Sequence, residues 1–249
     1  MAQISVEGFK NFFKYYVEES HQQLGIEKLY QLIPLDALDD NSEWMLQYRN
    51  QLKDQTNKIT QQPITKVQMG LIMNCSPESL PDSLMADFAR CVDLYQMDRI
   101  SIAYFLGQCG HESAGLRYPV EIASGINYEN RGDLGNIYPG DGVKFAGTGW
   151  IQVTGRYWHQ QYSDYLQKNG TFDEKIMEVG KTHTSEKYPW SISGYWWYAN
   201  NMNDFCKIKP PVDQVGQRVN GKYLPNGYED RRLYSKKAFE VLGLPYPGN

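Results

Sequence analysis

The chain has 249 residues, of which 41% are hydrophobic and 22% are charged, and its formal net charge at pH 7 is −4. This composition is typical of a globular protein that can bury a sizeable core. The slight acidic surplus argues against nucleic-acid binding, which needs a basic surface. No run approaches the roughly 18 apolar residues of a membrane-spanning helix, so we expect no membrane insertion.

Residues 1–63 predict a small helical N-terminal module that ends in a linker. Hydrophobic residues recur at helical spacing over residues 4–24, and shorter helices are expected near 26–33 and 42–52. Residues 53–63 are rich in Gln, Asn, Thr and Lys, which is typical of a linker. Two interpretations stay open: the module packs on the main domain, or it binds or docks on an unidentified partner.

From residue 64 onward the spacing of hydrophobic residues again predicts helices. Asp82 or Ser83, which follow a proline, can cap one helix. Asp98 starts a second, apolar helix that places Glu112 at its end. Burial raises the pKa of a carboxyl group, and a raised pKa suits a general acid near neutral pH. This helix end is therefore the first candidate for a catalytic centre.

The segment after this helix differs from the rest of the chain. Residues 122–155 are rich in Gly and Asn, and hydrophobic residues alternate between Val143 and Val153. This pattern predicts a long loop with a small inserted β-hairpin. Helical spacing then resumes in five segments, at 157–166, 172–179, 191–199, 212–219 and 229–242. The fold class expected for residues 64–249 is therefore mainly α.

Metal and thiol chemistry are poorly supported by the sequence. Cys91 and Cys109 fall in apolar helical patterns, which predicts buried free thiols. A pair of Cys109 and His111 cannot easily form an in-line dyad, because both lie at one helix end. His111 and Glu112 begin the zinc motif H-E-x-x-H, but position 115 is glycine. We expect no metal ion and no cofactor.

Two carboxylates, Glu112 and Glu121, are better candidates. Glu112 is flanked by glycine, serine and alanine, which let a substrate approach closely. Glu121 lies between a Pro-Val pair and an isoleucine, where a merely solubilising charge is not expected. Glycoside hydrolysis needs two carboxyl groups, one to protonate the leaving oxygen and one to activate water or attack carbon.

Four blocks of sequence resemble glycoside hydrolase family 19, which holds plant-type chitinases and lysozyme-like phage endolysins. The blocks are H-E-S-A-G at 111–115, Y-E-N-R-G-D-L-G-N with P-G-D-G at 128–142, F-A-G-T-G-W-I-Q-V-T-G-R-Y-W-H at 145–159, and Q-R-V-N-G with Y-E-D-R-R-L-Y at 217–234. They occur in the expected order and cover about residues 64–244.

The resemblance implies roles for individual residues. Glu112 matches the general acid, Glu121 matches the base that activates water, and Thr154 matches the residue that helps hold that water. Glu129 is a rival for the role of base. Six more residues match family positions in the sugar cleft, in the charge network around the acid or in the closing loop. They are Gln152, Asn220, Arg231, Tyr128, Glu129 and Arg131.

Two departures from the family pattern concern the preferred glycan. The usual G-R-G is Gly147–Thr148–Gly149 here, so an arginine is absent, and the usual N-G-G is Asn220–Gly221–Lys222. Both leave the proposed acid and base in place.

The resemblance implies a lysozyme-like helical domain that hydrolyses β-1,4 bonds between N-acetylated sugars with inversion. The expected substrate is the glycan polymer peptidoglycan, with chitin as the alternative. Isolated cysteines and an N-terminus without a secretory pattern favour an endolysin made in the cytoplasm and released to the cell wall by other means. A virion-associated lytic protein is a further alternative. An inactive glycan-binding protein is disfavoured by the intact set of Glu112, Glu121 and Thr154.

Overall fold

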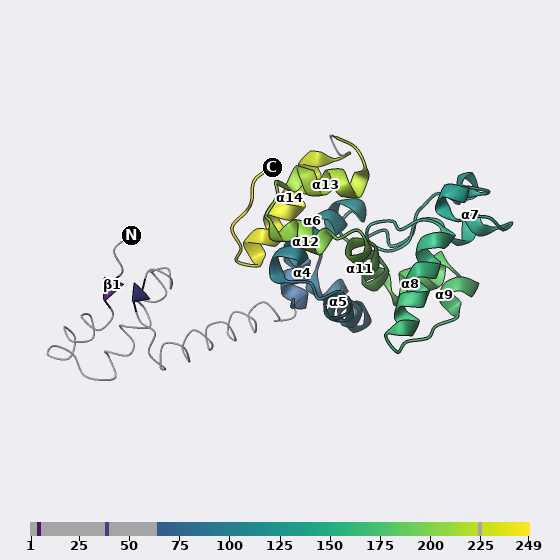
Figure 1. The fold of residues 1–249 in the computed structure, drawn as a ribbon, viewed down its shortest axis with the longest axis horizontal. Coiled ribbons are helices and arrows are strands. Elements are labelled where there is room, and N and C mark those ends of the chain that lie inside the picture. Colours follow the sequence, from purple (N-terminus) through teal and green to yellow (C-terminus); the bar gives the residue numbers. More distant parts are fainter. Residues whose placement is uncertain (1–3, 6–37, 40–63, 224–225) are drawn as a thin grey trace. The chain divides into compact units, whose positions relative to one another are not determined.

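The computed structural model describes residues 4–5, 38–39, 64–223 and 226–249 (Figure 1). The chain divides into two units, Met1–Thr60 and Gln61–Asn249. In the first unit, β1 (Ile4–Ser5) pairs in parallel with β2 (Leu38–Asp39). The predicted helix is therefore wrong for Ile4 and Ser5, because pairing with a distant segment and the β-branched Ile4 favour extended backbone. The other helices and the linker predicted before residue 64 lie outside the described residues.

The described part of the second unit is mainly α-helical, as predicted. Its α-helices are α4 (Lys66–Met73), α5 (Asp82–Leu94), α6 (Arg99–Glu112), α7 (Asp141–Lys144), α8 (Arg156–Lys168), α9 (Lys175–Glu178), α10 (Lys181–Lys187), α11 (Pro189–Ala199), α12 (Met202–Lys207), α13 (Val212–Asn220) and α14 (Tyr228–Val241). Short 3-10 helices lie at η2 (Pro77–Ser79), η3 (Ile126–Tyr128) and η4 (Gly132–Leu134). The helix predicted at 172–179 is reduced to α9, and α7, α10 and α12 were not predicted.

The predicted β-hairpin is not present. Thr148 forms single-residue antiparallel bridges with Val120 and Val153, and these bridges do not extend into strands. The backbone is left-handed at Gly149, with φ of 72°, and at Gln152, with φ of 56°. Since a strand cannot pass through left-handed residues, the chain turns after one pair. The start of the alternating pattern is taken up by α7 instead.

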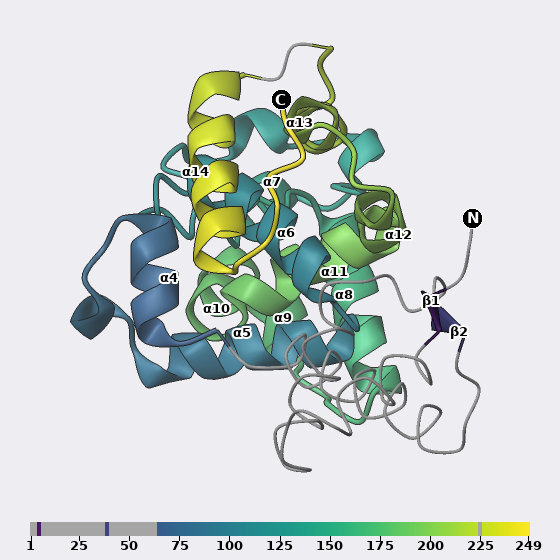
Figure 2. The same ribbon diagram turned by 90° about the vertical axis from the view of Figure 1, so that its left-hand side faces the viewer.

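Helix α6 lies at the centre of the core. The Asp98 side chain accepts a 2.7 Å hydrogen bond from the backbone N–H of Ser101, which confirms the predicted helix start. Every residue from Ser101 to Gly110 is buried. Helix α14 lies along α6 (Figures 1 and 2). The cap expected for α5 is wrong, because Pro81 occupies the N-cap position and no side chain caps that helix.

Helix α11 lies between α5 and α8 (Figure 1), and it also contacts α10. Its first backbone N–H groups donate to the buried carboxylate of Asp87 on α5, from Trp190 at 2.8 Å and Ser191 at 3.1 Å. This contact satisfies donors that a helix start leaves unpaired. Burial raises the pKa of Asp87 to about 6, although the same hydrogen bonds oppose that shift. Among the described residues, no helix is long and apolar enough to cross a membrane.

Candidate active site

Two glycines let α14 approach α6 closely. A Cβ atom at Gly107 would lie 2.2 Å from the Ser235 hydroxyl, and one at Gly110 would lie 2.4 Å from the Tyr234 ring. Larger residues at either position would force the helices apart. Because the helices lie so close, Arg231 in the second turn of α14 reaches the end of α6.

Glu112, the last residue of α6, forms an ion pair with Arg231. The Arg231 side chain is 1% exposed and that of Glu112 is 21% exposed, so a buried guanidinium holds a carboxylate that is still open to solvent. Arg231 also donates from Nη1 to Gln108 Oε1 at 2.7 Å and from Nε to the Asn226 carbonyl at 2.9 Å. Three acceptors therefore fix the position of the guanidinium.

Asn220, at the end of α13, belongs to the same chain of hydrogen bonds. Its Oδ1 accepts a 3.1 Å hydrogen bond from the backbone N–H of Asn226, whose carbonyl contacts Arg231. The structure thus brings together three of the predicted site residues, Glu112, Arg231 and Asn220. Beside them, His111 Nδ1 lies 2.8 Å from Asp230 Oδ2 and ties the end of α6 to the start of α14.

Gln108 and Asn226 were not predicted as site residues. Gln108 carries a detectable signal, because it is an amide in an apolar helix, one turn before Glu112. Asn226 acts through its backbone, which no residue-type pattern could reveal.

Glu121 is held through both of its carboxylate oxygens. Oε1 accepts a 2.9 Å hydrogen bond from the Tyr128 hydroxyl, and Oε2 accepts a 3.0 Å hydrogen bond from the Gly147 N–H. A Cβ atom at residue 147 would lie 3.1 Å from Glu121 Oε2, so glycine permits this close approach. Burial and the hydrogen bond to Glu121 raise the pKa of Tyr128 and keep its hydroxyl protonated as a donor.

Gln152 lies next to Glu121, and Thr154 follows it. Gln152 Nε2 donates to the Tyr118 carbonyl at 3.1 Å, and its Oε1 lies 2.6 Å from where a Cβ atom of Gly147 would stand. The Thr154 hydroxyl donates to the Gln152 carbonyl at 2.9 Å. Within the described residues Thr154 makes no hydrogen bond to Glu121, so its role in holding water stays a prediction.

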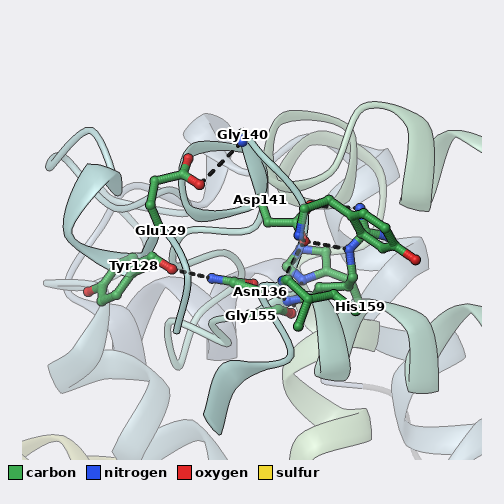
Figure 3. A network of polar contacts seen from close by, with 10 residues as sticks. Tyr128, Glu129, Asn136, Gly140, Asp141, Gly155 and His159 are labelled. Carbon is green, nitrogen blue, oxygen red and sulfur yellow. Dashed lines mark hydrogen bonds and ion pairs between the residues drawn. The ribbon is translucent and has the colours of Figure 1, made fainter. Parts of the chain in front are cut away.

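Glu129 and Arg131 contact other parts of the loop. Glu129 Oε2 accepts a 3.2 Å hydrogen bond from the Gly140 N–H, as Figure 3 shows. Arg131 forms two hydrogen bonds with Asp133, at 2.7 and 2.6 Å. In the described part of the chain, neither residue is hydrogen-bonded or ion-paired to Glu112 or Glu121.

The loop that carries Tyr128 is built around the buried carboxylate of Asp141. Arg156 donates two hydrogen bonds to it, at 2.7 and 2.6 Å, and two backbone N–H groups donate at 3.1 and 2.9 Å. Burial alone would raise the pKa of Asp141, but these donors outweigh it and the pKa is lowered. Asn136 accepts from the Arg156 N–H at 2.8 Å and donates to the Tyr128 carbonyl at 2.9 Å (Figure 3). The network therefore supports the residue that holds Glu121.

Thr148, at the position of the missing family arginine, points into the protein. Its hydroxyl is fully buried and lies 3.1 Å from the Lys181 carbonyl and 3.3 Å from the Thr184 hydroxyl. The departure from the family pattern therefore joins the loop to α10. His159 is also buried: its Nδ1–H donates to the Gly155 carbonyl at 2.9 Å, and burial lowers its pKa to about 4.

Cysteine and metal chemistry receive no support from the described residues. All four cysteines are free, and Cys91 and Cys109 are buried, as predicted. Burial raises the pKa of both thiols, so neither is a reactive thiolate. No group of three or more His, Cys, Asp or Glu in the described part of the chain is placed to hold a metal ion.

Two of the three comparisons with known proteins point to the same family, whereas no family model matches the chain. A glycosyl hydrolase family 19 domain-containing protein of Haemophilus influenzae is 28% identical over an alignment of 185 positions, and the match covers 61% of this chain and 83% of that protein. Chitinase C from Streptomyces griseus superposes with a TM-score of 0.55 at 15% identity, over 75% of this chain and 97% of its own. A bacterial family 19 chitinase superposes with a TM-score of 0.57 at 16% identity, over 76% of this chain and 98% of its own. A class IV family 19 chitinase from Zea mays superposes with a TM-score of 0.52 at 15% identity, over 72% of this chain and 92% of its own.

The helical fold is thus that of chitinase-type glycoside hydrolases. The predicted resemblance to glycoside hydrolase family 19 is confirmed by the relative from Haemophilus influenzae and by these structures. The chain is therefore similar to glycoside hydrolases of family 19 and shares the helical fold of family 19 chitinases.

Proposed function

We propose that the chain hydrolyses β-1,4 bonds between N-acetylated sugars with inversion, using Glu112 as general acid and Glu121 as general base. The proposal depends above all on one observation, the pairing of Glu112 with Arg231. A carboxyl group that is anchored on one side and open on the other can meet a substrate oxygen in a fixed position.

In the acid step, the exposed side of the Glu112 carboxylate first takes up a proton from solvent; Glu112 then gives this proton to the glycosidic oxygen and becomes a carboxylate again. The negative charge that forms there faces the buried guanidinium of Arg231. Because the guanidinium is already held by Gln108 and the Asn226 carbonyl, it needs no reorganisation when the charge appears. Asn220 supports this arrangement through Asn226.

In the base step, Glu121 takes a proton from a water molecule that attacks the sugar from the opposite face. Hydrogen bonds from Tyr128 and Gly147 fix the direction of the Glu121 carboxylate. Thr154 and Gln152 lie on the same loop as Gly147, and we propose that they help to position the water.

Peptidoglycan is the substrate that we propose first. The loop at residues 128–142 resembles that of endolysin-type members of the family, and four free cysteines are typical of a protein made in a reducing compartment such as the cytoplasm. Chitin is the second candidate, because the similar solved structures are chitinases. Residues 1–63 are proposed as a binding or docking module.

The test is to incubate the purified chain with peptidoglycan and with chitin oligomers and to identify the released ends by mass spectrometry. Inversion is tested by the anomer seen first in NMR spectra, which should be α when a β bond is cleaved. Glu112→Gln and Glu121→Gln should each abolish turnover, whereas the matched variant Glu129→Gln should keep it. Full activity of Glu112→Gln would refute the mechanism. Loss of activity in Glu129→Gln, with activity kept in Glu121→Gln, would assign the role of base to Glu129.

A further inference from the structure

Gln108 is a buried amide that makes only part of its possible hydrogen bonds. Its side chain is fully buried in α6, and its Oε1 accepts the 2.7 Å hydrogen bond from Arg231. Since a guanidinium only donates, the amide oxygen must face Arg231 and the amide nitrogen must point away. That nitrogen has no hydrogen-bond partner among the described residues.

A residue chosen only for stability would be different at this position. Burying an NH₂ group without a partner destabilises a fold, and a methionine of similar size would avoid that cost. Such local conflicts are expected where function constrains the residue. What Gln108 supplies, and methionine could not, is a neutral side-chain oxygen directed at the guanidinium that holds Glu112.

The neutrality of this oxygen has a consequence for the charge balance of the site. Arg231 is 1% exposed, and among the described residues Glu112 is its single ion-pair partner. Its remaining acceptors, the Gln108 amide and the Asn226 carbonyl, carry no net charge. A carboxylate at position 108 would divide the attraction of the guanidinium between two anions and would weaken its effect on Glu112.

We infer that Gln108 is a positioning residue for the acid, which fixes Arg231 against Glu112 without neutralising its charge. This inference rests on the proposed function, in which Glu112 gives up a proton. Other titratable groups around Glu112 do not replace Arg231. Cys109 is a buried neutral thiol on the same helix, and His111 is paired with Asp230 of α14.

Two substitutions separate positioning from packing. Gln108→Met keeps the volume but removes the acceptor, and Gln108→Glu keeps an oxygen acceptor but adds charge. The matched control is Ser235→Ala, because Ser235 is equally buried between α6 and α14 and its hydroxyl has no partner within the described residues. All three are compared with the unchanged chain on chitin oligomers and on soluble peptidoglycan fragments.

The expected results differ between the variants. Gln108→Met should lower kcat roughly tenfold to a hundredfold with KM unchanged, because the guanidinium is no longer fixed. Gln108→Glu should lower kcat by a similar factor with KM unchanged, because a second carboxylate competes with Glu112 for the guanidinium. Ser235→Ala should change neither constant. If Gln108→Met fails to fold by circular dichroism, Gln108→Glu alone carries the test. An unchanged kcat in a folded Gln108→Met together with an unchanged kcat in Gln108→Glu would overturn the inference.

An NMR measurement distinguishes this failure from failure of the proposed function. The Nε–H signal of a buried, paired arginine exchanges slowly and can be assigned to Arg231 by its loss in Arg231→Lys. We expect this signal in the unchanged chain and in Ser235→Ala, and we expect it to broaden or disappear in Gln108→Met. A broadened signal in a chain that cleaves neither glycan would refute the proposed function but support the positioning of Arg231 by Gln108. An unchanged signal in an active chain would refute the positioning alone.

Discussion

Replacing Tyr128 by phenylalanine tests how the proposed base is held. The substitution keeps the ring and removes only the hydroxyl that donates to Glu121 Oε1 at 2.9 Å. The hydrogen bond from the Gly147 N–H to the other oxygen stays. The variant therefore changes one contact of the carboxylate and leaves the loop network around Asp141 intact, because that network uses the Tyr128 backbone carbonyl.

The size of the effect follows from the two donors. A hydrogen bond to a charged group contributes about 1.5–3 kcal/mol. Glu121 is only partly buried and keeps its second donor, which places the loss at the lower end of that range. We expect kcat/KM to fall by about 1.5 kcal/mol of transition-state stabilisation, which is roughly tenfold.

The assay is the release of reducing ends from the cleaved glycan, measured over about six pH units from roughly pH 3 to pH 9. Tyr157→Phe is the matched control, because Tyr157 is exposed and its hydroxyl makes no hydrogen bond among the described residues. A wild-type rate in Tyr128→Phe across this range would refute the assignment of Glu121 as the group that Tyr128 supports. Equal losses in both variants would show that the effect has another cause.

Three further predictions concern stability. Burial lowers the pKa of folded His159 from 6.5 to about 4, so its neutral form stabilises the fold fully above pH 6.5 and this stability is lost as the pH falls toward 4. Relative to His159→Gln, the unchanged chain should lose about 3 kcal/mol of unfolding free energy as the pH falls through that window, measured by urea titration. The same pH dependence of the unfolding free energy in both chains would contradict this. Gly107→Ala should lower the unfolding free energy by about 1–3 kcal/mol and reduce kcat, since the added Cβ would lie 2.2 Å from a side-chain oxygen on α14. An unchanged melting temperature and unchanged activity would show that α6 and α14 can move apart without loss. Asp141→Asn should cost about 2 kcal/mol, because it leaves the partly buried Arg156 without its anion. The exposed-pair control Asp133→Asn should leave the melting temperature unchanged, and equal effects of the two would argue against a role for burial.

The helices could be predicted well because their signals are local. Asp98 shortly precedes the apolar run from Ile102 to Leu106, and the structure confirms that a helix begins at this point, with Asp98 as its cap. The segment at 229–242 has helical spacing, and α14 spans nearly the same residues. Glu112, at the end of the first of these helices, could be singled out from its small neighbours and from the family resemblance.

The contacts of the site could not be predicted, because they depend on approaches between distant segments. The spacing of Gly107 and Gly110 is visible in the sequence, but their partners on α14 are more than 120 residues away. The prediction of a β-hairpin was wrong for a related reason. Alternating hydrophobic residues predict strands, yet the left-handed backbone at Gly149 and Gln152 turns the chain after one bridge. The resulting loop directs Gly147 to Glu121.

The surroundings of the two carboxylates indicate the direction in which the proposed reaction transfers charge. During inversion the base loses negative charge as it takes a proton from water, and the acid gains negative charge as it gives its proton away. The buried cation, Arg231, faces Glu112, whereas Glu121 is held by two neutral donors. A fixed cation accelerates the reaction only where negative charge increases in the transition state. If Glu121 were the acid and Glu112 the base, negative charge would leave Arg231 during the reaction and the cation would oppose catalysis. In the proposed assignment, Arg231 therefore faces the carboxyl group on which negative charge increases once Glu112 has taken up its proton.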